Sequence, residues 1–174
     1  HDGGIRVLGP NCQGLANLAE GIPLTFSGAL YDVPRPPVGH VAFVSQSGAF
    51  GFSSFGVGME HGVRFRYVVT TGNQSDLDAV ECADYVLEDP EVRLLMLYLE
   101  GLEDGEAFLR LVRKARERDV AVAVLKAGRS PSAREAAKSH TAALTGDDRV
   151  WSAVFSQYGV IPMEDIDDII GIGQ

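Results

Sequence analysis

The sequence has little cysteine, few basic residues and no long apolar run, and each shortage excludes a class of protein. Its two cysteines, Cys12 and Cys82, lie far apart without metal-ligand spacing, so a disulfide framework is not expected and a reducing cytoplasmic setting is favoured. No apolar stretch approaches the ~20 residues of a membrane span. A secretory signal peptide is not recognisable either.

The shortage of basic residues limits the partners that the surface can attract. Fifteen Lys and Arg stand against 24 Asp and Glu, which gives a net charge of −9. This balance argues against a nucleic-acid partner, which requires a basic face. It still allows a small anionic ligand, because backbone N–H groups bind anions without basic side chains.

The length and the apolar content predict one domain, or one domain plus part of another. The chain has 174 residues, of which 45% are hydrophobic, enough for a substantial core. It starts at His1 without an initiator methionine. We therefore expect a piece of a longer protein.

The order of expected elements predicts an α/β fold. Residues 1–38 lack a repeating pattern apart from a possible short strand at 5–8, and three prolines at 34, 36 and 37 indicate a connector. From residue 39 onward strands and helices alternate. The expected strands are 40–45, 64–70, 94–99, 120–125 and 160–161, and the expected helices are 49–61, 76–88, 103–118, 147–158 and 163–170. This pattern is typical of a flavodoxin-like, doubly wound parallel sheet of about five strands in three α/β/α layers.

The candidate residues follow the strands of this sheet. In such folds ligands bind at the carboxyl ends of the strands. Ser47, Gly72, Glu100 and Lys126 each come just after an expected strand, and His140 lies in the loop after the fourth regular strand. We therefore expect one site at one edge.

A strand, a Ser/Gly turn and a helix follow one another around Ser47. The first turn of a helix has unpaired N–H groups and a partial positive charge, so this junction is a candidate phosphate site. Gly48 has no side chain to obstruct an anion. The alternative is that Ser47 only caps the helix. The Lys-Ser/Thr ending of a Walker loop is missing.

Glu100 and His140 are the candidates for chemistry. Glu100 directly follows an apolar strand, where a carboxylate requires a partner. An imidazole N–H would be such a partner, and the carboxylate would fix its tautomer. The alternatives are a solvated glutamate or a pair with Arg129. His140 stands among small residues in a loop that is long for this architecture, although a loop histidine can also be simply solvated.

Four segments together resemble the NDP-forming acyl-CoA synthetases and, more distantly, the α-subunit of succinyl-CoA synthetase. Residues 9–12, with Asn11 and Cys12, resemble the signature at the exit of that family's CoA-binding domain. Residues 44–49 resemble the start of its phosphate-facing helix, and residues 99–101 and 139–141 resemble its glutamate and phosphohistidine segments. The resemblance covers nearly the whole chain in the right order. Residues 141–144, Thr-Ala-Ala-Leu, depart from the common Thr-Gly-Ala/Ser-Leu, which stiffens the loop but keeps the histidine.

The resemblance implies a reversible reaction of acid, CoA and NTP to acyl-CoA, NDP and phosphate. His140 would carry the phosphoryl group, and Glu100 would orient its imidazole. The remaining implied site residues hold the phosphate (Ser47, Gly48, Ala49), line the site (Gly72, Asn73) or lie near it (Asn11, Cys12).

The resemblance also implies parts that this chain lacks. Residues 1–38 would be the tail of a CoA-binding domain plus a linker, and residues 39–174 the flavodoxin-like domain with the phosphohistidine loop. A nucleotide-grasp domain or subunit would bring ATP or ADP with Mg²⁺, and this chain would itself hold mainly phosphate. A small carboxylic acid substrate, an oligomer and a cytoplasmic location are expected. The isolated chain is expected to be inactive.

Two other functions fit parts of the pattern. One is a non-catalytic, acyl-CoA-sensing domain of a protein acetyltransferase, but its histidine is often replaced, and His140 is present here. The other is a serine hydrolase, because Ser47, Glu100 and His140 follow the α/β-hydrolase order. Ser45, however, stands where Gly-x-Ser-x-Gly requires its first glycine.

Overall fold

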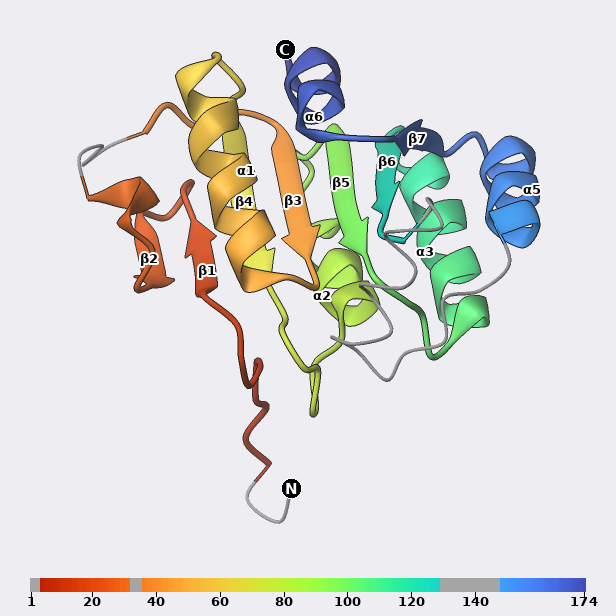
Figure 1. The fold of residues 1–174 in the computed structure, drawn as a ribbon, viewed down its shortest axis with the longest axis horizontal. Helices are drawn as coiled ribbons and strands as arrows, with labels where there is room; N and C mark the ends of the chain where they lie inside the picture. Colours follow the sequence, from red (N-terminus) through yellow and green to blue (C-terminus); the bar gives the residue numbers. More distant parts are fainter. Residues whose placement is uncertain (1–3, 32–35, 129–147) are drawn as a thin grey trace.

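In the part of the chain that the structure describes, one seven-stranded sheet has helices on both faces (Figure 1). The computed structural model describes residues 4–31, 36–128 and 148–174. The sheet order is β2-β1-β4-β3-β5-β6-β7. The parallel strands are β3 (Val41–Ser45), β4 (Phe65–Thr70), β5 (Leu94–Leu99), β6 (Ala121–Lys126) and β7 (Ile161–Met163). Their order β4-β3-β5-β6-β7 is that of a flavodoxin-like sheet, so the predicted fold class is confirmed.

The sheet has more strands than the sequence predicted. Two short antiparallel strands, β1 (Gly14–Asn17) and β2 (Ile22–Thr25), extend it beyond β4. Both are only four residues long and contain Gly14 or Pro23, so neither has a recognisable strand pattern. The prediction of a possible strand at 5–8 is wrong: within this range Leu8 alone makes a β-bridge, an isolated one to Leu77.

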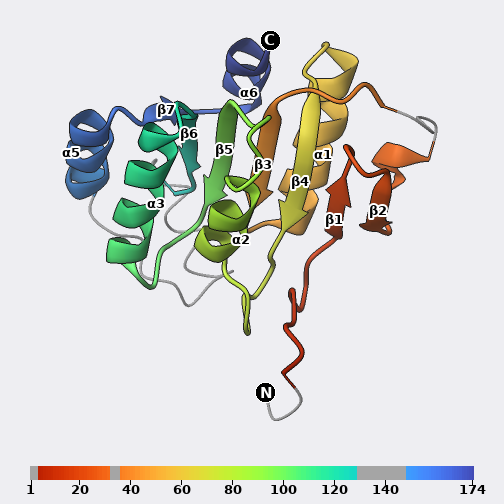
Figure 2. The same cartoon turned by 180° about the vertical axis from the view of Figure 1, so that it is seen from behind.

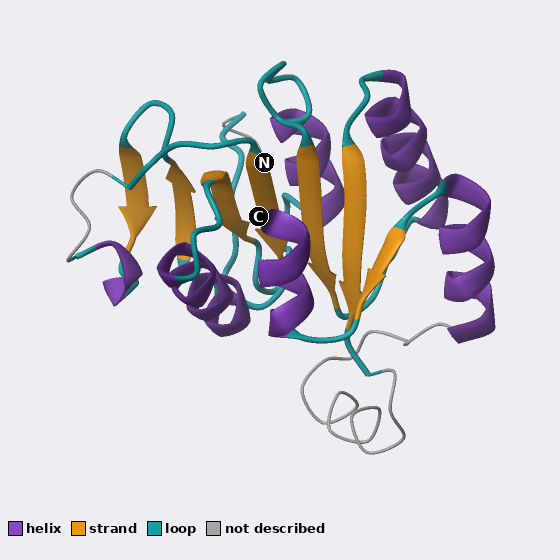
Figure 3. Cartoon of the chain, turned by 90° about the horizontal axis from the view of Figure 1, so that it is seen from above, coloured by secondary structure: helices purple, strands orange, loops and turns teal. Residues whose placement is uncertain are grey.

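Helices cover the two faces in separate pairs (Figures 1 and 2). The helices are α1 (Gly48–Glu60), α2 (Ala79–Val86), α3 (Gly105–Glu117), α5 (Asp148–Tyr158) and α6 (Ile166–Gly173), with a 3₁₀ turn η1 (Gly28–Leu30). Helices α1 and α6 pack on one face, whereas α2 and α3 pack on the other with α5 beside them. Viewed from above, the strands lie between these two helical layers (Figure 3).

Helices α2 and α6 begin three residues later than the sequence predicted, and each has an aspartate at its observed boundary. The Asp78 carboxylate accepts the N–H of Glu81, and the Glu81 side chain accepts the N–H of Asp78, so α2 begins after this capping box. Asp165 caps α6 by accepting N–H groups of the helix's first turn. A capping aspartate has extended backbone, so it excludes itself and the residues before it from the helix.

The core consists of two apolar layers separated by the sheet. Phenylalanines dominate the layer under α1 and α6, whereas aliphatic side chains dominate the layer under α2 and α3. The first layer includes Phe43, Phe52, Phe55 and Phe65, and the second includes Leu95, Leu97, Leu99, Leu111 and Phe108. This packing holds the parallel strands rigidly and so fixes where their carboxyl ends meet.

Candidate functional site

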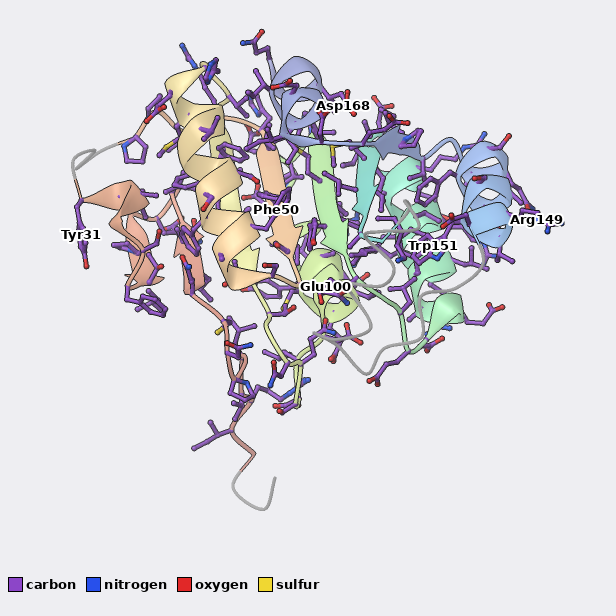
Figure 4. The ribbon with its side chains drawn as sticks, in the orientation of Figure 1. Tyr31, Phe50, Glu100, Arg149, Trp151 and Asp168 are labelled. Atoms are coloured by element: carbon purple, nitrogen blue, oxygen red, sulfur yellow. The ribbon has the colours of Figure 1, made fainter. Side chains whose placement is uncertain are left out.

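The carboxyl ends of the parallel strands bring the candidate residues to one edge. In the register of the sheet Ser45 lies opposite both Thr70 and Tyr98, and Leu99 lies opposite Lys126. The segments that leave these strands therefore start level with one another. Figure 4 shows Glu100 at this edge. The N-terminal segment reaches the same end of the sheet in Figure 1.

Ser47 is the cap of helix α1. Its backbone is extended, with φ −93° and ψ 123°, and its Oγ accepts the N–H of Phe50 at 3.3 Å. The Oγ of Ser45 donates to the carbonyl of Ser47 at 2.7 Å, which holds the turn. Capping is therefore observed. The first N–H groups of α1 have no acceptor within the helix and face this edge, so they suit an anion.

Gly48 has a packing role that the sequence did not reveal. A Cβ there would lie 2.9 Å from the backbone nitrogen of Gln13 and 3.3 Å from the carbonyl carbon of Cys12. The missing side chain is therefore required by the close approach of the N-terminal segment. The role that the sequence predicted for Gly48, to leave room for a phosphate, stays a prediction in addition to this observed packing role.

The N-terminal segment is bound to the loop after β4. The N–H of Asn73 donates to the carbonyl of Pro10 at 2.8 Å, and the Asn11 side-chain amide donates to the side-chain oxygen of Asn73 at 3.2 Å. Gly72 has φ +59°, and a Cβ there would lie 2.2 Å from the Pro10 oxygen. Cys12 is partly buried in the same segment. Asn11, Cys12, Gly72 and Asn73 are thus brought together.

Glu100 is partly buried, and side chains from two neighbouring strand ends hold its main chain. Its N–H donates to Oε1 of Gln46 at 2.5 Å, and its carbonyl accepts from Nζ of Lys126 at 3.0 Å. Burial raises the pKa of Tyr98, and the nearby Glu100 carboxylate raises it further. The ring of Tyr98 stacks on that of Phe50, with 4.2 Å between centroids, so helix α1 and strand β5 contact each other next to the site.

Lys126 is a site residue to which the sequence assigned no role. It is only 4% exposed, and its Nζ donates to the carbonyls of Glu100 and of Ala127, the latter at 2.6 Å. The Nζ also lies 5.7 Å from the centroid of the Trp151 ring. Two carbonyls and an aromatic face offset part of the cost of burying an ammonium group. The sequence feature that could have identified Lys126 is its place at the end of an apolar run, which forms strand β6.

The remaining candidates lie outside the described residues. His140 and its loop, together with Arg129, fall in the range 129–147. Both possible partners of Glu100, the imidazole of His140 and the guanidinium of Arg129, therefore stay predictions.

The described part of the chain has neither a cluster of metal ligands nor a membrane-spanning helix. Within it, no three His, Cys, Asp or Glu side chains gather to hold a metal ion. None of the helices described there has the length and the apolar content needed to cross a bilayer.

Ser47 has a different geometry from a hydrolase nucleophile. In α/β-hydrolases the nucleophile occupies a sharp, strained turn between strand and helix. Ser47 instead has ordinary extended backbone, and its Oγ accepts a helix N–H. This geometry disfavours the serine hydrolase.

Comparison with known proteins gives a consistent family. The family model described as succinyl-CoA ligase like flavodoxin domain matches residues 38–174. The chain is 33% identical over all its 174 residues to acetate–CoA ligase [ADP-forming] II subunit alpha of Pyrococcus furiosus, of which it covers 36%. It is 36% identical over 95% of its length to acetate–CoA ligase [ADP-forming] I of Archaeoglobus fulgidus, of which it covers 23%.

A solved structure agrees with these relatives. The fold matches the dinucleotide forming acetyl-coenzyme A synthetase 1 of Ca. Korarchaeum cryptofilum, in complex with phosphate and ADP, with a TM-score of 0.85 and 32% identity. That match covers 97% of this chain and 35% of the larger one. The chain thus spans about a quarter to a third of the length of the proteins that it matches.

Proposed function

The chain belongs to the family of succinyl-CoA ligase-like flavodoxin domains, and from this we propose that it is the phosphoryl-transfer domain of an ADP-forming acyl-CoA ligase. Relatives of at least 33% identity that align with almost all of it are named as ADP-forming acetate–CoA ligases or their alpha subunits. The observation that carries the proposal is the single edge where the start of α1, the loop after β4 and Glu100 meet.

The proposed reaction proceeds in three reversible displacements. A phosphate oxygen attacks the thioester carbonyl of acyl-CoA, the C–S bond breaks, and CoA leaves as a thiolate that takes up a proton. A ring nitrogen of His140 then attacks phosphorus of the acyl phosphate, and the P–O bond breaks to release the acid. Finally the β-phosphate of ADP attacks phosphohistidine, the P–N bond breaks, and ATP leaves with the imidazole restored.

The residues of this chain contribute binding and orientation. The first N–H groups of α1, at Gly48 and Ala49 behind the Ser47 cap, bind the phosphate by hydrogen bonds and by the partial positive charge of the helix end. Gly72 and Asn73, in the loop after β4 that bonds to the N-terminal segment, also line this site. The Glu100 carboxylate accepts an N–H of His140, which fixes the tautomer that attacks phosphorus and stabilises the charged ring as it forms.

The other parts of the enzyme come from outside residues 39–174. Residues 1–38 are, in this proposal, the tail of a CoA-binding domain and a linker, of which Gly14–Asn17 and Ile22–Thr25 add β1 and β2 to the sheet of this domain. A family match that begins at residue 38 supports this boundary. CoA, ATP or ADP with Mg²⁺, and a small carboxylic acid bind mainly to these other domains or subunits. The relatives' greater length supports this division of labour. We further propose that the full enzyme is an oligomer and that it acts in the cytoplasm.

Product analysis on the full-length protein that carries this chain tests the proposed function. Incubation with acetate, CoA and ATP is expected to yield acetyl-CoA, ADP and phosphate in equal amounts, and acetyl-CoA with ADP and phosphate is expected to yield ATP. Formation of AMP and pyrophosphate would contradict the proposal. If the protein instead binds acetyl-CoA but turns over neither acetate nor other small acids, the result would favour an acyl-CoA-sensing domain.

A further inference from the structure

We propose that Gln46 is a positioning residue, whose side-chain amide sets the place of Glu100 relative to the phosphate site at the start of α1. This inference rests on the proposed function, because it needs Glu100 to act in phosphoryl transfer. Gln46 itself contacts no reacting atom in this proposal. It acts through the main chain of Glu100 and Gly101.

The contacts of Gln46 form a clamp around one peptide segment. Its Oε1 accepts the N–H of Glu100 at 2.5 Å and the N–H of Gly101 at 3.1 Å. Its Nε2 donates to the carbonyl of Gly101 at 2.8 Å. Its own backbone N–H donates to the carbonyl of Tyr98 at 3.0 Å. The turn that starts at the end of β5 is thus bonded to Gln46 at several points.

Only a primary amide of this length satisfies both sides of the clamp. Gln46 is 9% exposed, so a donor or acceptor left unpaired there loses its bond to water and destabilises the fold. A carboxylate could accept the two N–H groups but could not donate to Gly101. An aliphatic side chain could do neither.

The clamp links three strand ends. Nε2 of Gln46 also lies 3.3 Å from Oε1 of Gln74, which accepts the first N–H of α2, from Ala79, at 2.7 Å. Lys126 holds the carbonyl of Glu100 from the other neighbouring strand. Gln46 directly precedes Ser47, the cap of α1. Any displacement of Glu100 relative to the phosphate helix must therefore break the Gln46 bonds.

The decisive variant is Gln46→Met in the full-length protein, because methionine has similar length and no strong hydrogen-bonding group. We expect kcat for acetyl-CoA formation to fall roughly 10- to 100-fold, as small misplacements of a catalytic group do. The KM values for nucleotide and CoA are expected to stay within about 2-fold, since the proposal gives Gln46 no contact with either ligand. Gln157→Met, a change of the same type at an exposed position on α5, is the matched control and is expected to leave kcat unchanged.

A double-mutant cycle with Glu100→Gln separates positioning from a merely structural role. If Gln46 acts through the Glu100 carboxylate, Gln46→Met is expected to cost less than about 3-fold when Glu100 is already glutamine. An equal fold loss in both backgrounds would overturn the proposal, because the two residues would then act independently. If Gln46→Met does not fold, Gln46→Asn serves in the same cycle, since it keeps an amide that is too short to hold both sides.

Failure of the proposed function has a different signature, because the parental protein would then form AMP and pyrophosphate, or no acetyl-CoA at all. Glu100→Gln at the parental rate would instead remove Glu100 from the chemistry and overturn the positioning role with it. A slow Glu100→Gln variant combined with independent losses at Gln46 overturns the positioning role alone and leaves the proposed function intact.

Discussion

At the scale of single residues, Ser47 combines a structural role with a proposed functional one. It caps α1 by accepting the N–H of Phe50, and this cap stabilises the helix whether or not an anion binds. The proposed phosphate uses the neighbouring N–H groups of the same turn. The two roles place different demands on the side chain: a cap needs any small acceptor, whereas an anion site excludes a negative one.

Two substitutions at Ser47 separate these roles. Ser47→Ala is expected to lower the free energy of unfolding by about 1 kcal/mol, because the cap is lost. Ser47→Asp is expected to keep the stability, since aspartate caps as well as serine, but to weaken phosphate binding at least about 10-fold through charge repulsion. Thermal unfolding and calorimetric titration with phosphate measure the two effects. Parental phosphate affinity in Ser47→Asp would remove the start of α1 from the site.

Gly72 shows how closely the N-terminal segment packs against the site. Gly72→Ala is expected to lower the free energy of unfolding by about 1–3 kcal/mol, because alanine is strained in the left-handed backbone conformation of this position. A further loss is expected because the new Cβ would lie 2.2 Å from the Pro10 oxygen. Gly159→Ala is the matched control, with φ +71° and no atom within 4 Å of the Cβ. Urea unfolding is expected to show a loss at Gly72 that exceeds the control by about 1 kcal/mol or more. Equal losses would mean that the Pro10 contact contributes nothing.

At the scale of elements, a partly buried ion pair connects strand β4 to the segment that follows helix α2. Oδ2 of Asp89 accepts from Nε of Arg66 at 2.6 Å and from the Tyr67 hydroxyl at 2.7 Å. Partial burial opposes ionisation of Asp89, but the bonds from Arg66, the Glu91 N–H and Tyr67 outweigh it and lower its pKa. Burial and the bond to Asp89 raise the pKa of Tyr67 to about 12.

The raised pKa of Tyr67 predicts a specific loss of stability in alkali. The unfolded chain releases the phenol proton near its ordinary pKa of about 10, whereas the folded chain keeps it until about 12. The contribution of Tyr67 is therefore complete below pH 10 and falls as the pH rises towards 12.

Tyr67→Phe isolates this effect, since Cys82, whose pKa is also raised, is present in both proteins. The substitution is expected to cost about 1 kcal/mol at pH 8 through the lost hydrogen bond. The difference between the parent and Tyr67→Phe is expected to shrink in urea unfolding as the pH passes 10. A difference that is constant up to pH 11.5 would contradict the folded pKa of about 12.

Long apolar runs at regular spacing made most elements predictable. Strand β5 occupies the predicted range 94–99, and α1, α3 and α5 begin within two residues of expectation. Strands β1 and β2 could not be predicted, because β1 is stabilised by pairing with β4, about 50 residues further along the chain, and β2 by pairing with β1. The early boundary predicted for α2 came from counting the cap Asp78 and the residues before it as helix.

At the scale of the whole molecule, parallel topology explains why the site could be partly predicted. Residues that follow parallel strands lie at one edge, so Ser47, Gly72 and Glu100 could be assigned together. The roles of Gln46 and Lys126 could not, since they depend on hydrogen bonds to Glu100 that exist only once β3, β5 and β6 are in register.

The arrangement as a whole fits a domain that receives reactants from its neighbours. The sheet edge presents a helix start and a clamped glutamate, and the N-terminal segment packs against the same edge. This chain spans only 36% of its relative from Pyrococcus furiosus, which leaves ample sequence there for domains that bind CoA and nucleotide. The central claim is that a phosphoryl group passes between such domains on His140.

Phosphorylation of His140 tests this claim most directly. The full-length protein is incubated with radiolabelled ATP and Mg²⁺, or with acetyl-CoA and labelled phosphate, and the protein-bound label is measured. We expect a label that is lost in acid and kept in base, as for a phosphoramidate. A folded His140→Ala variant is expected to lose both the labelling and the turnover. A His140→Ala protein that still forms acetyl-CoA at the parental rate would contradict the account.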